Sequence, residues 1–100
     1  MKVNWTDNAV KHLVSIYDYI SQNSPFYAQK MVDRLTRRSQ QIADFPQSGR
    51  TVPEYRADDL REVFEGPYRL IYRIKPEQVD VLAVIHGARQ LPPEPEFESS

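Results

Sequence analysis

The sequence predicts an α+β domain in which a two-helix hairpin packs on one face of a small antiparallel sheet. Apolar residues recur every three to four positions in the first half of the chain and alternate in the second half. The length of 100 residues, with 40% hydrophobic composition, suits one core and leaves no room for a second. We therefore expect one domain over residues 1–91, followed by an acidic, proline-containing tail over residues 92–100.

The first half of the chain reads as one strand followed by two helices. Residues 2–5 alternate between polar and apolar, which is typical of a strand. Residues 7–21 place their apolar side chains on one helical face, and Thr6 is a suitable N-cap for that helix. Pro25 suits the first position of a second helix, which must end before Pro46.

The second half of the chain reads as a loop and three strands. Residues 46–59 have no period and contain several helix and strand breakers, so they predict a loop. The three alternating segments that follow are joined by short turns and must be antiparallel neighbours: 60–65, 68–75 and 79–86. The alternation leaves the position of the first strand in the sheet open.

One face of this sheet is expected to remain uncovered, because a single layer of helices covers only the other. In the middle strand, Tyr68, Leu70, Tyr72 and Ile74 share the face that we assign to the core. Simple alternation along the last two strands then gives the uncovered face a mixed apolar and basic surface, with Arg69, Ile71, Arg73, Leu82, Val84 and His86. Such a surface predicts a binding site.

Composition excludes several classes of function. The chain has no cysteine, which excludes disulfides, thiol catalysis and thiolate zinc sites. It contains no phosphate-binding loop, dinucleotide fingerprint, nucleophile elbow or paired-histidine helix, so we expect no cofactor and no metal. No apolar run is long enough to span a bilayer or to act as a signal peptide, so we expect a cytoplasmic protein without membrane contacts.

The remaining candidates for chemistry are arginines and one histidine on or beside the sheet. Arg69 and Arg73 suit phosphate or carboxylate binding, but a solvated outer sheet face explains them about equally well. His86 ends the last strand, where a structural histidine is the more common outcome, and Arg89 is the better functional candidate. His12 falls opposite the apolar stripe of its helix and is expected to be solvated.

Several motifs together resemble those of the RelE/ParE superfamily of bacterial toxins, and more closely its ParE-like branch. They cover residues 1 to about 91, and their order and spacing carry the resemblance: Trp5-Thr6-Asp7, the Phe45 to Arg50 loop followed by Val52-Pro53-Glu54, Leu60-Arg61-Glu62, Gly66-Pro67-Tyr68-Arg69-Leu70-Ile71-Tyr72, and Val84 to Arg89. The resemblance implies the toxin of a type II toxin–antitoxin system, forming a complex with a cognate antitoxin. An acidic antitoxin would set its carboxylates against Arg69, Arg73 or Arg89.

The resemblance also implies two alternative targets. ParE-like toxins poison DNA gyrase without chemistry of their own, whereas RelE-like toxins cut messenger RNA on the ribosome. Arg69 and Arg89 match two catalytic arginines of RelE proteins, but the RelE lysines are replaced here by Arg61 and two glutamates, and no late tyrosine follows Arg89.

We therefore expect a non-enzymatic gyrase inhibitor that contacts its target or antitoxin through the sheet face and the end of the last strand, with Arg61, Arg69, Ile71, Arg73, Leu82, Val84 and Arg89. In the alternative, an mRNA interferase, the catalytic residues are Arg69, Arg89 and His86. Glu62 or Glu65 would then serve with His86 as base and acid. A third possibility is a degenerate family member that only binds the antitoxin.

Overall fold

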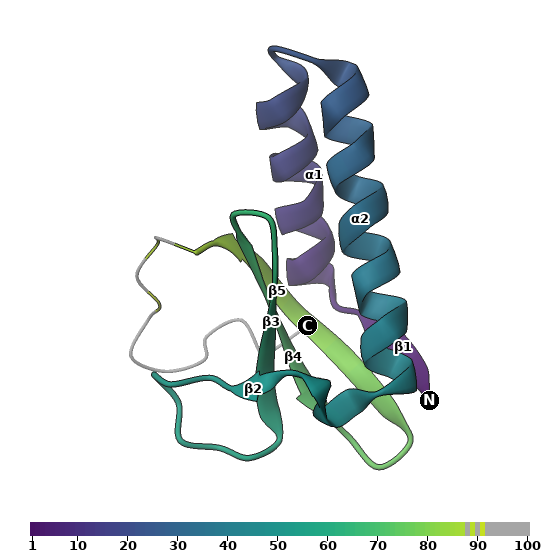
Figure 1. The fold of residues 1–100 in the computed structure, drawn as a ribbon, viewed down its shortest axis with the longest axis vertical. Coiled ribbons are helices and arrows are strands. Elements are labelled where there is room, and N and C mark those ends of the chain that lie inside the picture. The colour runs from purple at the N-terminus through teal and green to yellow at the C-terminus, as the bar shows by residue number, and fades with distance from the viewer. Residues whose placement is uncertain (88, 90, 92–100) are drawn as a thin grey trace.

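The computed structural model describes residues 1–87, 89 and 91, and in these the α+β prediction is confirmed (Figure 1). The elements are β1 (Lys2–Trp5), α1 (Asp7–Ser21), α2 (Pro25–Asp44), the 3₁₀ turn η1 (Pro46–Ser48), β2 (Arg50–Thr51), β3 (Leu60–Glu65), β4 (Tyr68–Ile74) and β5 (Gln78–His86). The predicted tail over residues 92–100 lies outside the described residues. No helix among the described residues is long and apolar enough to cross a membrane.

The two helices begin where the sequence predicts. The Thr6 side chain accepts a hydrogen bond from the backbone N–H of Ala9 at 3.2 Å, and Ser24 caps Tyr27 in the same way at 3.2 Å. Each cap satisfies a backbone donor that the first helical turn leaves without a partner. The helices form an antiparallel hairpin whose lower part lies against the sheet (Figure 1).

The sheet has five strands in the order β1-β5-β4-β3-β2. β1 pairs with β5 in parallel, which settles the position that alternation left open, and all other pairs are antiparallel. The short strand β2 lies in the segment predicted to be a loop, so that prediction is wrong at two residues. A strand of two residues is too short to show alternation in the sequence. It is a strand because its backbone pairs with that of β3.

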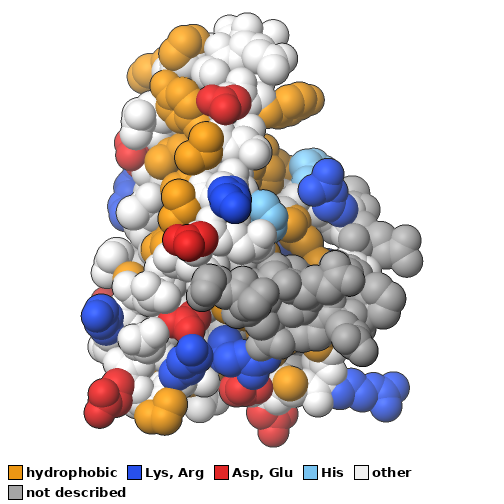
Figure 2. Space-filling model, turned by 180° about the vertical axis from the view of Figure 1, so that it is seen from behind, with side chains coloured by type: hydrophobic (Ala, Val, Ile, Leu, Met, Phe, Trp, Pro, Cys, Tyr) orange, Lys and Arg blue, Asp and Glu red, His pale blue; other side chains and the backbone are white. Residues whose placement is uncertain are grey.

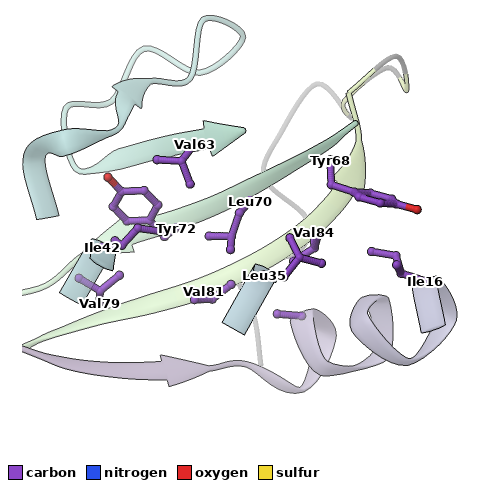
Figure 3. Packing of buried hydrophobic residues seen from close by; sticks show 11 residues of the cluster. Ile16, Leu35, Ile42, Val63, Tyr68, Leu70, Tyr72, Val79, Val81 and Val84 are labelled. Carbon is purple, nitrogen blue, oxygen red and sulfur yellow. The ribbon is translucent and has the colours of Figure 1, made fainter. Parts of the chain in front are cut away.

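The main core lies between the helices and the sheet (Figure 3). Leu35 and Ile42 of α2 face Leu70, Tyr72 and Val81 of the sheet, and all five are at most 1% exposed. Tyr68 and Ile16 lie together at one end of this core, beside Val84 (Figure 3). The predicted assignment of Tyr68, Leu70, Tyr72 and Ile74 to the helix face is therefore confirmed.

A bulge in β5 overturns part of the predicted alternation. Ile71 pairs with Ala83 and Tyr72 pairs with Val81, so Leu82 is an extra residue without a partner in β4. Beyond it, alternation is reversed: Val84 joins the helix-side core, and the ring of His86 lies 6.0 Å from that of Tyr68. The expectation that Val84 and His86 lie on the uncovered face is therefore wrong, while Leu82 does lie there.

The sheet face opposite the helices is covered as well. Val52 and Tyr55, together with Leu91, form a second cluster over the sheet residues Leu60, Ile71, Leu82, Ala83 and Ile85. Ile71 is 0% exposed and Leu82 is 2% exposed, so neither contributes accessible surface. The predicted open, partly apolar face is therefore wrong. The sequence of a segment without periodicity does not indicate whether it folds back over a sheet. The segment that contains Val52 and Tyr55 does so.

Candidate functional site

The outer sheet face holds a buried network of charges centred on Arg69. Its guanidinium forms a bidentate salt bridge with Glu54, in which Nη1 and Nη2 each donate a hydrogen bond at 3.0 Å. It also donates to Glu62, through Nε at 2.8 Å and through Nη2. Arg69 is 5% exposed and Glu62 is 1% exposed. Glu62 also accepts from Arg50 Nε at 2.6 Å. Arg69 thus has two carboxylates as partners, and its charge is neutralised inside the fold.

The pKa values within this network follow from its hydrogen bonds. The hydrogen bond from Arg69 holds the pKa of Glu54 below its ordinary value of 4.5, because that bond favours the ionised carboxylate. The same hydrogen bonds, which Glu54 accepts, raise the pKa of Arg69, and those accepted by Glu62 add to the effect. Both members of the pair therefore stay charged over the whole physiological range.

The other two sheet arginines are engaged in separate contacts. Arg61 lies on the helix side of β3, opposite Tyr72, and donates to the carbonyls of Asp58 at 2.8 Å and Gly49 at 3.0 Å. It therefore holds the ends of the 49–58 segment and does not converge with Arg69. Arg73 shares the outer face with Arg69 and forms an ion pair with Asp59.

His86 and Arg89 come together at the C-terminal end of β5. The backbone N–H of Arg89 donates to the carbonyl of His86 at 2.9 Å, and both side chains are exposed. His12 of α1, which the sequence placed in solvent, lies beside them and is half-buried. Three of the basic side chains thus gather at this corner. The predicted candidates separate into a neutralised group around Arg69 and an accessible group around Arg89.

His12 has a structural task that the sequence did not reveal. β1 ends at Trp5, and beyond it side chains from the start of α1 hydrogen-bond to the backbone along the edge of β5. The side chains of Thr6 and Asn8 donate to the carbonyls of Val81 and Leu82, respectively. His12 Nδ1 accepts a hydrogen bond from the backbone N–H of Val84 at 3.1 Å. Burial lowers the pKa of His12, and the charge of Arg89 lowers it further. Helical periodicity alone contains no signal for such an edge contact.

Replacing His12 tests this contact through pH. In the unfolded chain, His12 becomes protonated below about pH 6.5, whereas its pKa is lower in the folded state. Protonation therefore favours the unfolded state, and the free energy of unfolding falls as the pH drops below about 6.5. In His12→Asn the amide oxygen keeps an acceptor near the Nδ1 position, so we expect near-normal stability at pH 7 and a flatter pH dependence in urea unfolding between pH 5 and 7.

His12→Leu serves as the contrasting variant. It leaves the Val84 N–H without an acceptor and should lose about 1–3 kcal/mol at pH 7. An unchanged pH slope in His12→Asn would contradict the role of His12 in acid sensitivity.

Comparison with solved structures shows that this fold is shared with another protein. The fold is similar to that of a chain in the structure entitled "Chromosomal ParDE TA system from P. aeruginosa", with a TM-score of 0.72 and 22% identity over 86% of this chain and 95% of that chain. At that identity the likeness shows the shared fold. The helix hairpin on a five-stranded sheet is thus an arrangement that this chain shares with a chain of that structure.

Sequence comparison gives the family. Residues 3–91 match the model of the ParE toxin of the parDE type II toxin–antitoxin system, and the chain belongs to this family. It is 36% identical to Toxin RelE2 of Caulobacter vibrioides, over 88% of this chain and 97% of that protein. It is 32% identical to the protein named "Putative toxin Y4kP" of Sinorhizobium fredii, over 91% of this chain and 93% of that protein. The protein is therefore a type II toxin whose partner is an antitoxin.

Proposed function

We propose that this toxin inhibits DNA gyrase by binding and performs no chemistry itself. The observation that carries the proposal is the state of Arg69, the residue that matches a catalytic arginine of RelE-like toxins. Its side chain is 6% exposed and its guanidinium is held by Glu54 and Glu62. A guanidinium in this position has its donors occupied and its charge offset.

RNA cleavage requires positive charge where negative charge develops on the phosphate. On the outer face, the donors of Arg69 and of Arg50 point to carboxylates, and Arg73 pairs with Asp59. Glu62 is 0% exposed at its side chain, so it is sequestered from any substrate and cannot act as the base of an interferase in this conformation. This arrangement supports binding over catalysis.

A supercoiling assay tests the proposal. Purified toxin, added at micromolar concentration to bacterial gyrase, relaxed plasmid and ATP, should block supercoiling, and prior addition of the antitoxin should restore it. Ribosomes programmed with messenger RNA should give no toxin-dependent cleavage in a parallel reaction. Folded toxin that leaves gyrase active would overturn the proposal.

The alternative, ribosome-dependent cleavage of messenger RNA, is favoured by one observation: Arg89 is exposed and lies beside His12 and His86. If cleavage is observed, Arg89→Ala and His86→Ala should abolish it, whereas Arg56→Ala, at another exposed arginine, should not. If the toxin arrests growth but neither inhibits gyrase nor cleaves messenger RNA, its target is a different one. No arrest at all would leave a protein that only binds its antitoxin.

A further inference from the structure

A pocket of about 490 Å³ opens between α1 and the ends of β4 and β5, and it lies apart from the Arg69 network. Figure 2 shows this side of the molecule, where histidine side chains (pale blue) and Lys or Arg side chains (blue) lie near apolar surface (orange). The volume lies within the range of sites that hold small-molecule ligands. The polar residues that line it are His12, Ser15, Tyr19, Tyr68, His86 and Arg89.

These polar groups are able to donate hydrogen bonds. His12 accepts the Val84 N–H at Nδ1, so its neutral ring carries the proton on Nε2 and donates from that atom. The hydroxyls of Ser15 and of the two tyrosines also donate, and the guanidinium of Arg89 offers five N–H groups. None of the lining residues is acidic. A pocket with this lining suits an anion.

Arg89 supplies the positive charge of the pocket. Its backbone is tied to β5 through the hydrogen bond to His86, so its side chain starts from a defined point on the pocket rim. Its charge reaches the His12 ring, where it disfavours protonation. Within residues 1–87, 89 and 91, no carboxylate forms a salt bridge with Arg89. This differs from Arg69, whose charge is already neutralised.

The rest of the pocket lining is apolar. Ile16 of α1 and Val84 and Ile85 of β5 contribute aliphatic surface, and the tyrosine rings add aromatic surface. A hydrated inorganic ion would leave this surface unused, whereas an apolar stem would bury it. A carboxylate also matches the planar geometry of a guanidinium. We propose that this pocket binds a carboxylate carried on an apolar stem.

Phenylacetate is the probe for this proposal, added to the full-length toxin labelled with ¹⁵N. The imidazole signals of His12 and His86 should shift and saturate. Phenethylamine, which has a similar stem but a positive charge, should give no saturable shift. Arg89→Gln should weaken phenylacetate binding about tenfold or more, because it removes a charge-assisted hydrogen bond. The matched control Arg56→Gln, at an exposed arginine that does not line the pocket, should bind like the wild type.

Two further ligands identify the source of the carboxylate. If a peptide such as acetyl-Phe-Glu-amide binds more tightly than phenylacetate, and its Gln counterpart does not bind, the natural ligand is an acidic side chain of a partner. If phenylacetate binds at least as well, the ligand is a free acid. Equal binding of acid and amine, or unchanged binding in Arg89→Gln, would overturn the proposal. All readings are made on the isolated toxin, so they do not depend on gyrase inhibition.

Discussion

Glu62→Leu lowers the free energy of unfolding by about 3–5 kcal/mol, the largest effect that we expect from a single change in this protein. The substitution leaves the Arg69 guanidinium, 6% exposed, with Glu54 as its remaining carboxylate partner. Removing one member of a buried ion pair leaves a charge in a medium that solvates it poorly. Urea unfolding followed by circular dichroism measures the loss.

A second substitution separates the missing charge from the change in packing. Glu62→Leu/Arg69→Met replaces both buried charges by apolar groups and should recover at least half of the loss, because the buried Arg69 charge, which Glu54 alone would otherwise offset, is removed as well. The control is Glu65→Gln, whose partner Arg34 is 45% exposed, and it should cost less than about 1 kcal/mol. A double variant as unstable as the single variant would show that the charge balance of Arg69 is not what stabilises this face.

Gly49→Ala should destabilise the fold by about 3 kcal/mol for a purely steric reason. The backbone at Gly49 has φ −79° and ψ 156°, which any residue adopts, so no conformational strain is involved. A Cβ atom would lie 2.7 Å from the carbonyl oxygen of Glu62 and would collide with the hydroxyl of Tyr72. That hydroxyl is fixed, since it donates to Pro46 O at 2.6 Å and accepts from Gly49 N–H at 3.0 Å. Overpacking of this kind typically costs about 1–3 kcal/mol.

Thermal unfolding of four variants tests the steric explanation: Gly49→Ala, Gly87→Ala, Tyr72→Phe and the double variant Tyr72→Phe/Gly49→Ala. Gly87→Ala is the matched control, because the nearest atom to its Cβ is Pro67 O at 3.3 Å, and it should cost clearly less. In a Tyr72→Phe background, Gly49→Ala should cost less than in the wild type, since part of the collision is removed. Equal costs in both backgrounds would place the strain at the Glu62 carbonyl alone.

Local sequence patterns determined the elements and much of their orientation. Thr6 and Pro25 locate the helix starts because capping depends only on residues within one turn. Alternation in β4 assigns Leu70 and Tyr72 to the helix face because the strand is regular there. The motif series also led to the toxin family, which the match over residues 3–91 confirms.

Only the tertiary structure decided the state of the candidate site. Whether Arg69 is an open cation or a neutralised one depends on Glu62 and Glu54, which lie 7 and 15 positions away. His12 and Val84 meet across 72 positions. The extra residue Leu82 reverses the alternation that places Val84. The periodicity of a segment predicts which of its faces is buried. Strand register, the covering of a sheet face by a loop and ion pairing depend on contacts between residues that are distant in the sequence. The sequence by itself therefore determined the fold class and family, and packing determined which basic groups remain accessible.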